Sequence, residues 1–169
     1  MTTPERIEAM LDREAIRDLA HRYAVAVCSR DADDMAELFD VEVENGRWGP
    51  GRDGVRAFYG NFFQSDERPH LFHVGTHRVD LGDGDTATGV AFTRYLTTGA
   101  DGTWNDTMIV YFDTYRRRDG EWFFVRRKET VGARLVVQAA PPVERPPGSR
   151  FVPPTEEHWS VWRAGRHGD

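Results

Sequence analysis

The chain has 169 residues, of which 39% are hydrophobic and 30% charged, and its formal net charge is −6. This composition is typical of one soluble domain with a packed core, and the acidic balance disfavours nucleic-acid binding, which usually needs a basic face. The single cysteine, Cys28, excludes an intramolecular disulfide bond. The first residues lack the apolar stretch of a secretion signal, and no stretch approaches the roughly 20 apolar residues of a membrane span. We therefore expect a cytoplasmic protein that binds neither nucleic acid nor membrane.

The first part of the chain carries helical patterns. Thr3 followed by Pro4 is typical of a helix start, and apolar residues then recur at three- and four-residue steps to about Cys28. A short second helix is expected after a cap at Asp31 or Asp33. These two helices would precede every long strand of the chain.

A short strand and a third helix are expected next. Residues 41–44 alternate valine with glutamate, which predicts a strand. Asp53 is the expected cap of a third helix, and aromatic residues including Phe58 and Phe62 lie on one side of it. A helix with such a face packs on an apolar surface.

After Pro69 the apolar period changes from about 3.6 to about 2, which indicates strands. Gly/Asp turns separate four long segments, and we expect an antiparallel meander of strands over residues 70–81, 86–98, 104–117 and 121–131. Helices followed by a meander predict an α+β fold, in which a curved, mostly antiparallel sheet wraps around the N-terminal helices. The open end of such a cone-shaped barrel is a natural pocket.

The C-terminal part differs in composition. Residues 141–154 hold six of the nine prolines, so we expect an extended, irregular segment. Beyond it, Trp159 and Trp162, with Phe151 inside it, predict a tail that packs on the domain or on a neighbouring subunit. The predicted organisation is a domain over residues 1–140 and an extension over residues 141–169.

His70, His73 and His77 form a histidine cluster. On a regular strand, residues four apart share a face but lie ~13 Å apart, so two imidazoles cannot both bind one metal at ~2.1 Å. A bulge at Gly75 would change this geometry. We predict no metal site, and an acid–base role for a single histidine fits the residue type better.

Three stretches together resemble the SnoaL-like family of the nuclear-transport-factor-two-like superfamily. They are DREAIRDL at residues 12–19, HVGTH at residues 73–77 and YFDTY at residues 111–115, within a resemblance over about residues 10–131. The superfamily holds enzymes, carriers and transport factors, so the resemblance speaks to fold more than to function.

Within that superfamily the chain looks most similar to the dehydratase and dehydrochlorinase group. The resemblance implies catalysis by a pocket histidine, without metal or organic cofactor. It places His73 as the general base, Tyr23 as a hydrogen-bond donor and Arg127 as a stabiliser of negative charge.

One position departs from the family. An aspartate that orients the catalytic histidine is replaced here by Cys28, and a thiol is a weak donor. Asp31 and Asp113 are alternative orienting groups, and Cys28 itself is either a nucleophile or an inert buried residue. The further residues expected to bind substrate, besides Cys28, are Trp48, Phe58, Phe62, His77 and Tyr95.

Three functions remain open from the sequence. The first is a cofactor-independent lyase or isomerase, dehydratase-like, that acts on a small hydrophobic, cyclic substrate by histidine acid–base catalysis. The second is a polyketide-type cyclase, and the third is a non-catalytic small-molecule binding protein. Because helices would cover only one face of the sheet, we also expect a homodimer or a higher homo-oligomer.

Overall fold

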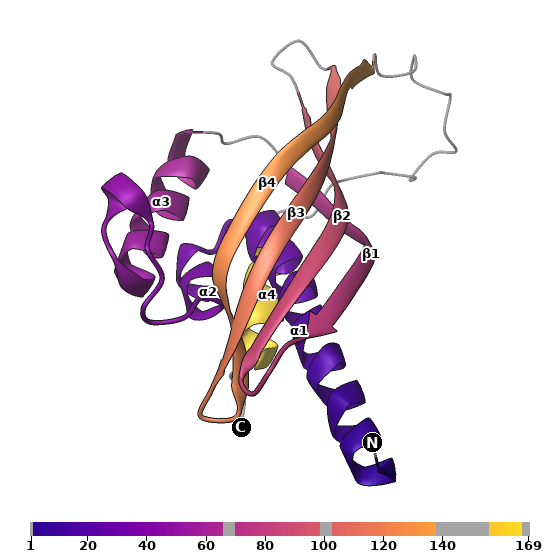
Figure 1. Cartoon of the computed structure of the whole chain (residues 1–169). Helices are drawn as coiled ribbons and strands as arrows, with labels where there is room; N and C mark the ends of the chain where they lie inside the picture. Colours follow the sequence, from indigo (N-terminus) through magenta and orange to yellow (C-terminus); the bar gives the residue numbers. More distant parts are fainter. Residues whose placement is uncertain (1, 66–69, 99–102, 138–155, 167–169) are drawn as a thin grey trace.

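The computed structural model describes residues 2–65, 70–98, 103–137 and 156–166. Helices come first and a sheet follows, which confirms the predicted α+β class (Figure 1). The elements are α1 (Thr3–Ser29), α2 (Ala32–Glu37), the 3-10 turn η1 (Gly46–Trp48), α3 (Gly51–Ser65), β1 (His70–Leu81), β2 (Thr86–Thr98), β3 (Trp104–Arg118), β4 (Glu121–Val137) and α4 (Glu156–Arg166).

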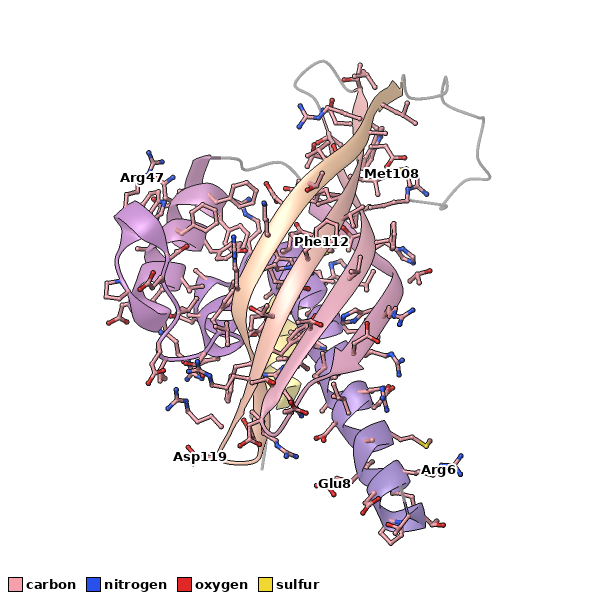
Figure 2. All side chains as sticks on the ribbon, in the orientation of Figure 1. Arg6, Glu8, Arg47, Met108, Phe112 and Asp119 are labelled. Carbon is pink, nitrogen blue, oxygen red and sulfur yellow. The ribbon has the colours of Figure 1, made fainter. Side chains whose placement is uncertain are left out.

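Helix α1 starts one residue earlier than the sequence predicts. Thr2 is the N-cap and forms a capping box with Glu5, which satisfies backbone donors that have no partner within the helix. The first turns of α1 extend beyond the sheet and are exposed, as the labels of Arg6 and Glu8 in Figure 2 show. The later turns bury one face, so α1 has an exposed end and a core-forming end.

The segment after α2 corrects the prediction of a strand over residues 41–44. Asp40 is 1% exposed, and its side chain accepts a hydrogen bond from the backbone of Glu42 at 2.8 Å, which holds a turn. Arg118 donates to the same carboxylate from β3. Helix α2 is capped by Asp31, one of the two predicted caps. Helix α3 begins at Gly51, ahead of the expected cap Asp53.

The four strands form one antiparallel sheet in the order β1-β2-β3-β4. The tight turn between β3 and β4 has positive φ at Asp119 and Gly120, which suits the twist of a hairpin. In Figure 1, the later turns of α1 lie behind the strands, α2 lies beside β4, and α3 lies farther to the left. Among the described residues, no helix covers the near face of the sheet. Strand β4 reaches Val137, six residues beyond its predicted end.

A bulge in β1 decides which of its side chains face the helices. Val74 pairs with Thr93 and His77 with Ala91, so Gly75 and Thr76 together oppose one residue of β2. At Gly75 a Cβ would lie 3.1 Å from a backbone carbonyl oxygen, which favours glycine there. The expectation that residues four apart share a face fails here, because the bulge inserts one residue between them.

The core lies between the inner face of the sheet and the helices. It includes Ile16 and Leu19 of α1, Met35 of α2, and Tyr115 and Phe124 of the sheet. Its extension toward β2 and β3 contains Ala91 and Tyr111. Helix α3 also contributes Val55 and Phe63 to this core.

The predicted C-terminal extension falls partly outside the described residues, and Phe151 is among those not described. In α4, the rings of Trp159 and Trp162 meet at 6.0 Å between centroids. Trp162 borders a hollow together with side chains of α1 and α2. Packing of the tail on its own domain or on a neighbour stays a prediction. In the part of the chain that the structure describes, no helix has the length and apolar character needed to cross a membrane.

Candidate functional site

A cavity of about 420 Å³ lies between the inner face of the sheet, α1 and α3. Aromatic rings from five elements (α1, α3, β1, β2 and β3) build much of its wall, and polar side chains from β2, β3 and β4 complete it. The lining residues include Tyr23, Phe58, Tyr59, Phe62, Phe72, Tyr95, Tyr111, Ile109, Val131, Thr97, Asn105, Thr107, Glu129 and Arg134. A volume of this size suits a compact organic molecule.

A pair of tyrosine hydroxyls marks the closed end of the cavity. The hydroxyl oxygens of Tyr23 and Tyr59 are 3.0 Å apart, so one donates to the other. Burial raises the pKa of Tyr59 and, by the same cause, that of Tyr111. These phenols therefore stay protonated near neutral pH and can act as hydrogen-bond donors rather than bases.

Arg127 lies directly behind this closed end, and its side chain is only 4% exposed. Its guanidinium carbon is 4.0 Å from the ring centroid of Tyr23 and 3.9 Å from that of Tyr111. The guanidinium is 3.6 Å from Asp113, yet none of its nitrogens has a hydrogen-bond partner among the described residues. Ring faces and one carboxylate thus hold the buried cation.

A chain of polar groups continues from Arg127 toward β1. The hydroxyl of Tyr115 donates to Asp113 at 3.0 Å, and Nε2 of His77 is 3.0 Å from the same hydroxyl. Because that hydroxyl has one proton, Nε2 of His77 must be the donor whenever Tyr115 donates to Asp113. Nδ1 of His77 is buried without a partner among the described residues.

Burial shifts the pKa values of the two titratable groups of this chain, His77 and Asp113, in opposite directions. Burial, with the charge of Arg127 adding to it, lowers the pKa of His77 to about 4. Burial raises the pKa of Asp113 to about 6, although Arg127 opposes that rise. At neutral pH the chain therefore consists of a neutral imidazole and a carboxylate paired with Arg127.

Two charged side chains of β4 line the cavity. Glu129 pairs with Tyr111 in the sheet, and Arg134 pairs with Thr107. Neither is among the residues singled out from the sequence. Strand alternation places Glu129 on the same face of β4 as Arg127. A register shift at Gly132 then adds one residue before Arg134, so a simple period-2 pattern would put Arg134 on the wrong face.

His73 is not in the cavity, which corrects the principal expectation from the sequence. It pairs with Arg94 on the outer face of the sheet, and its side chain is exposed. The bulge after Val74 places His77 on the inner face instead. His77, however, contacts Tyr115 and does not line the cavity.

The other predicted residues divide into three groups. Tyr23, Phe58, Phe62 and Tyr95 line the cavity, while Arg127 lies behind it. Trp48 contacts Phe58, with 5.9 Å between ring centroids, and is one layer away from the cavity. Cys28 is half-buried, and its sulfur accepts a hydrogen bond from the backbone of Phe72 at 3.2 Å.

The environment of Cys28 does not activate a nucleophile. Burial raises the pKa of this thiol, although the hydrogen bond from Phe72 opposes the rise. Cys28 is therefore protonated at neutral pH, and in the described structure it neither lines the cavity nor forms a hydrogen bond with a histidine. Of the alternative orienting acids, Asp31 caps α2, whereas Asp113 belongs to the buried chain.

The described residues contain no group of three or more His, Cys, Asp or Glu side chains placed to hold a metal ion. The charged residues that line the cavity are instead one acid, Glu129, and one base, Arg134, at separate positions on β4.

Residues 8–128 match the model of the SnoaL-like domain. The chain belongs to the SnoaL-like family. Among curated protein sequences, none gives a significant match. The fold is similar to that of a hexachlorocyclohexane dehydrochlorinase, LinA-type3, from Novosphingobium barchaimii LL02, with 21% identity, a TM-score of 0.69, and coverage of 88% of this chain and 99% of that one.

Two further solved structures support this architecture. An NTF2-like protein with a cystatin-like fold from Novosphingobium aromaticivorans is 26% identical, with a TM-score of 0.64, over 76% of this chain and 87% of that one. A candidate scytalone dehydratase from Novosphingobium aromaticivorans is 18% identical, with a TM-score of 0.65, over 84% and 97%. The SnoaL-like chain thus has the cystatin-like fold of NTF2-like proteins.

Proposed function

We propose that this SnoaL-like protein is a cofactor-independent lyase or isomerase that acts on a small, hydrophobic, cyclic substrate with an acidic C–H bond. The observation that carries the proposal is the Tyr23–Tyr59 hydroxyl pair at the closed end of an aromatic cavity. Dehydrochlorinase and scytalone dehydratase names among the structural neighbours agree with this class of chemistry.

The proposed reaction starts with removal of a proton from carbon. Glu129 is the one carboxylate among the described residues that line the cavity, and it takes the proton in place of the expected His73. The electron pair of the C–H bond forms a C=C bond to the adjacent carbonyl carbon, while the carbonyl π pair moves to the oxygen and gives an enolate. The substrate then regains a proton at another carbon in an isomerisation, or expels a leaving group in an elimination.

The tyrosine pair stabilises the developing negative oxygen. A buried hydroxyl that is already aimed into the cavity donates a hydrogen bond without the reorganisation that water requires. Arg127 supports this step from behind, since its guanidinium carbon lies 4.0 Å from the ring centroid of Tyr23 and its ion pair with Asp113 is 3.6 Å long, without a hydrogen bond. It acts through the rings and is a positioning residue in this mechanism.

Proton exchange tests the proposal without knowledge of the natural substrate. We would incubate the protein with 2-tetralone, a cyclic ketone with acidic C–H bonds, in D2O and follow deuterium incorporation by NMR. Exchange above the buffer rate is expected. Glu129→Gln should lower the catalysed rate by about 10²-fold or more, and Tyr59→Phe by about 10²-fold, as for loss of a base or an oxyanion donor.

Glu121→Gln is the matched control, because Glu121 lies on the same strand at the far hairpin, away from the cavity. It should leave the exchange rate unchanged. Equal rates for the wild-type protein, Glu129→Gln and buffer would contradict the proposal.

A non-catalytic binding function is the second candidate. The outward orientation of His73, and a cysteine in place of the family aspartate, favour it, because the expected acid–base pair is not assembled. Tight binding of 2-tetralone with no exchange would support this function. A polyketide-type cyclase would instead respond most strongly to a change of shape at Phe58 or Phe62.

A further inference from the structure

The polarity of the cavity changes steadily along β3. Tyr111, Ile109, Thr107 and Asn105 alternate on one face and all line the cavity. Phenol and alkyl groups thus give way to a hydroxyl and an amide over six residues, which is ~20 Å of strand. Thr97 of β2 pairs with Asn105 and adds a second hydroxyl at the polar end.

Arg134 provides positive charge at the polar end. It pairs with Thr107 in the sheet, four residues along β3 from Tyr111, which corresponds to ~13 Å. Within the described part of the chain, Arg134 has no ion pair or hydrogen bond. Glu129, the other charged lining residue, pairs with Tyr111 at the opposite end, so the two charges of β4 are separated along the cavity.

We infer that the cavity takes an elongated amphipathic ligand, with a flat apolar ring among the aromatic side chains and a carboxylate at Arg134. The aromatic end supplies apolar contact, and the guanidinium offers a fork of donors that matches a carboxylate. The hydroxyl and amide groups between them suit a polar linker. This inference rests on the proposed function only in placing the substrate in the same cavity, since it concerns binding and not turnover.

A matched pair of probes tests the inference by calorimetry. 6-Phenylhexanoate has a ring, a spacer and a carboxylate, and 6-phenylhexanamide has the same shape without the charge. The wild-type protein should bind the carboxylate about five- to tenfold more tightly than the amide, as expected for one partly exposed ion pair. Arg134→Gln should remove the preference, and Arg134→Lys should retain most of it.

Arg126→Gln is the control, because Arg126 lies on the same strand but pairs with Thr114 on the outer face. It should keep the full preference. Equal affinity of the wild-type protein for the two probes, binding of neither probe, or an unchanged preference in Arg134→Gln would each overturn the inference. A preference for the carboxylate probe without any proton exchange would support this inference and contradict the proposed catalysis. Proton exchange without that preference would support the proposed catalysis and contradict this inference.

Discussion

At the scale of single residues, the buried Asp113–Arg127 pair is the most consequential interaction behind the cavity. Both side chains are almost fully buried, and each is the nearest compensating charge of the other. Asp113→Ala would leave a buried cation with only ring faces around it. We expect the free energy of unfolding to fall by about 3–5 kcal/mol. Urea denaturation measures the loss, and a loss below about 1 kcal/mol would show that the rings alone hold Arg127.

The two titrating ends of the buried chain give a second residue-scale prediction. The folded-state pKa of His77 is lowered to about 4, so its contribution to stability rises between about pH 4 and pH 6.5. The folded-state pKa of Asp113 is raised to about 6, so its contribution falls as pH rises from about 4 to 6. The two contributions to the free energy of unfolding therefore change with pH in opposite directions over the same range, about pH 4 to 6.

Single substitutions should separate these slopes. Relative to the wild-type protein, Asp113→Asn should gain stability more steeply from pH 4 to pH 6.5, because the opposing carboxyl is removed. His77→Gln should gain it less steeply over the same range. Urea titrations at five pH values measure both slopes, and identical slopes in all three proteins would contradict the two pKa shifts.

At the scale of elements, two glycines predict opposite effects of the same substitution. At Gly89 of β2 a Cβ would lie 2.9 Å from the carbonyl oxygen of Arg78 and 3.1 Å from the hydroxyl of Tyr115. Gly89→Ala should therefore displace Tyr115 and cost about 1–3 kcal/mol.

Gly60 of α3 is the matched control, because a Cβ there meets nothing within 4 Å. Gly60→Ala should raise stability by about 0.5–1 kcal/mol through helix propensity. Thermal denaturation of both variants checks the pair, and equal shifts of the two melting temperatures would argue against the packing of Tyr115 on β2.

Sequence patterns predict the helices and strands of this fold better than they predict which face of the sheet each side chain occupies. The limits of β1 and β2 follow from the alternation and the Gly/Asp turn, and the first helix follows from its apolar steps. The faces of His73 and His77 do not, because one extra residue near Gly75 puts these two side chains on opposite faces of the sheet. Tyr23, Phe58, Phe62 and Tyr95 line the cavity as expected. Glu129 and Arg134 could not be placed in it from the sequence, because their positions depend on how β4 pairs with β3.

At the scale of the whole molecule, the outer face of the sheet remains exposed in the isolated chain. Phe92, Met108 and Phe112 are each about half exposed there, and the latter two are labelled on β3 in Figure 2. Exposed apolar side chains grouped on one face mark an association surface. We propose that a second copy of the chain covers this face, in line with the expected homo-oligomer.

A charge on that face should shift the assembly toward the monomer. We expect Phe112→Glu to lower the molar mass measured by light scattering, because a carboxylate would be buried in the interface. Val41→Glu, at an exposed turn after α2, should leave the mass unchanged. A monomeric wild-type protein, or an unchanged mass in Phe112→Glu, would exclude this interface.

The closed end of the cavity also sets an order of events during synthesis. Tyr23 lies on the first helix, and Arg127, the cation that packs against its ring, lies on the last strand of the sheet, about 100 residues later. At about 5–20 residues per second, Tyr23 emerges from the ribosome several seconds before Arg127 is made. Asp113, on the strand before, must also wait for Arg127. A nascent chain that ends before β4 therefore has Asp113 to bury and lacks the cation that pairs with it, so we expect the closed end of the cavity to form only after β4 has been made.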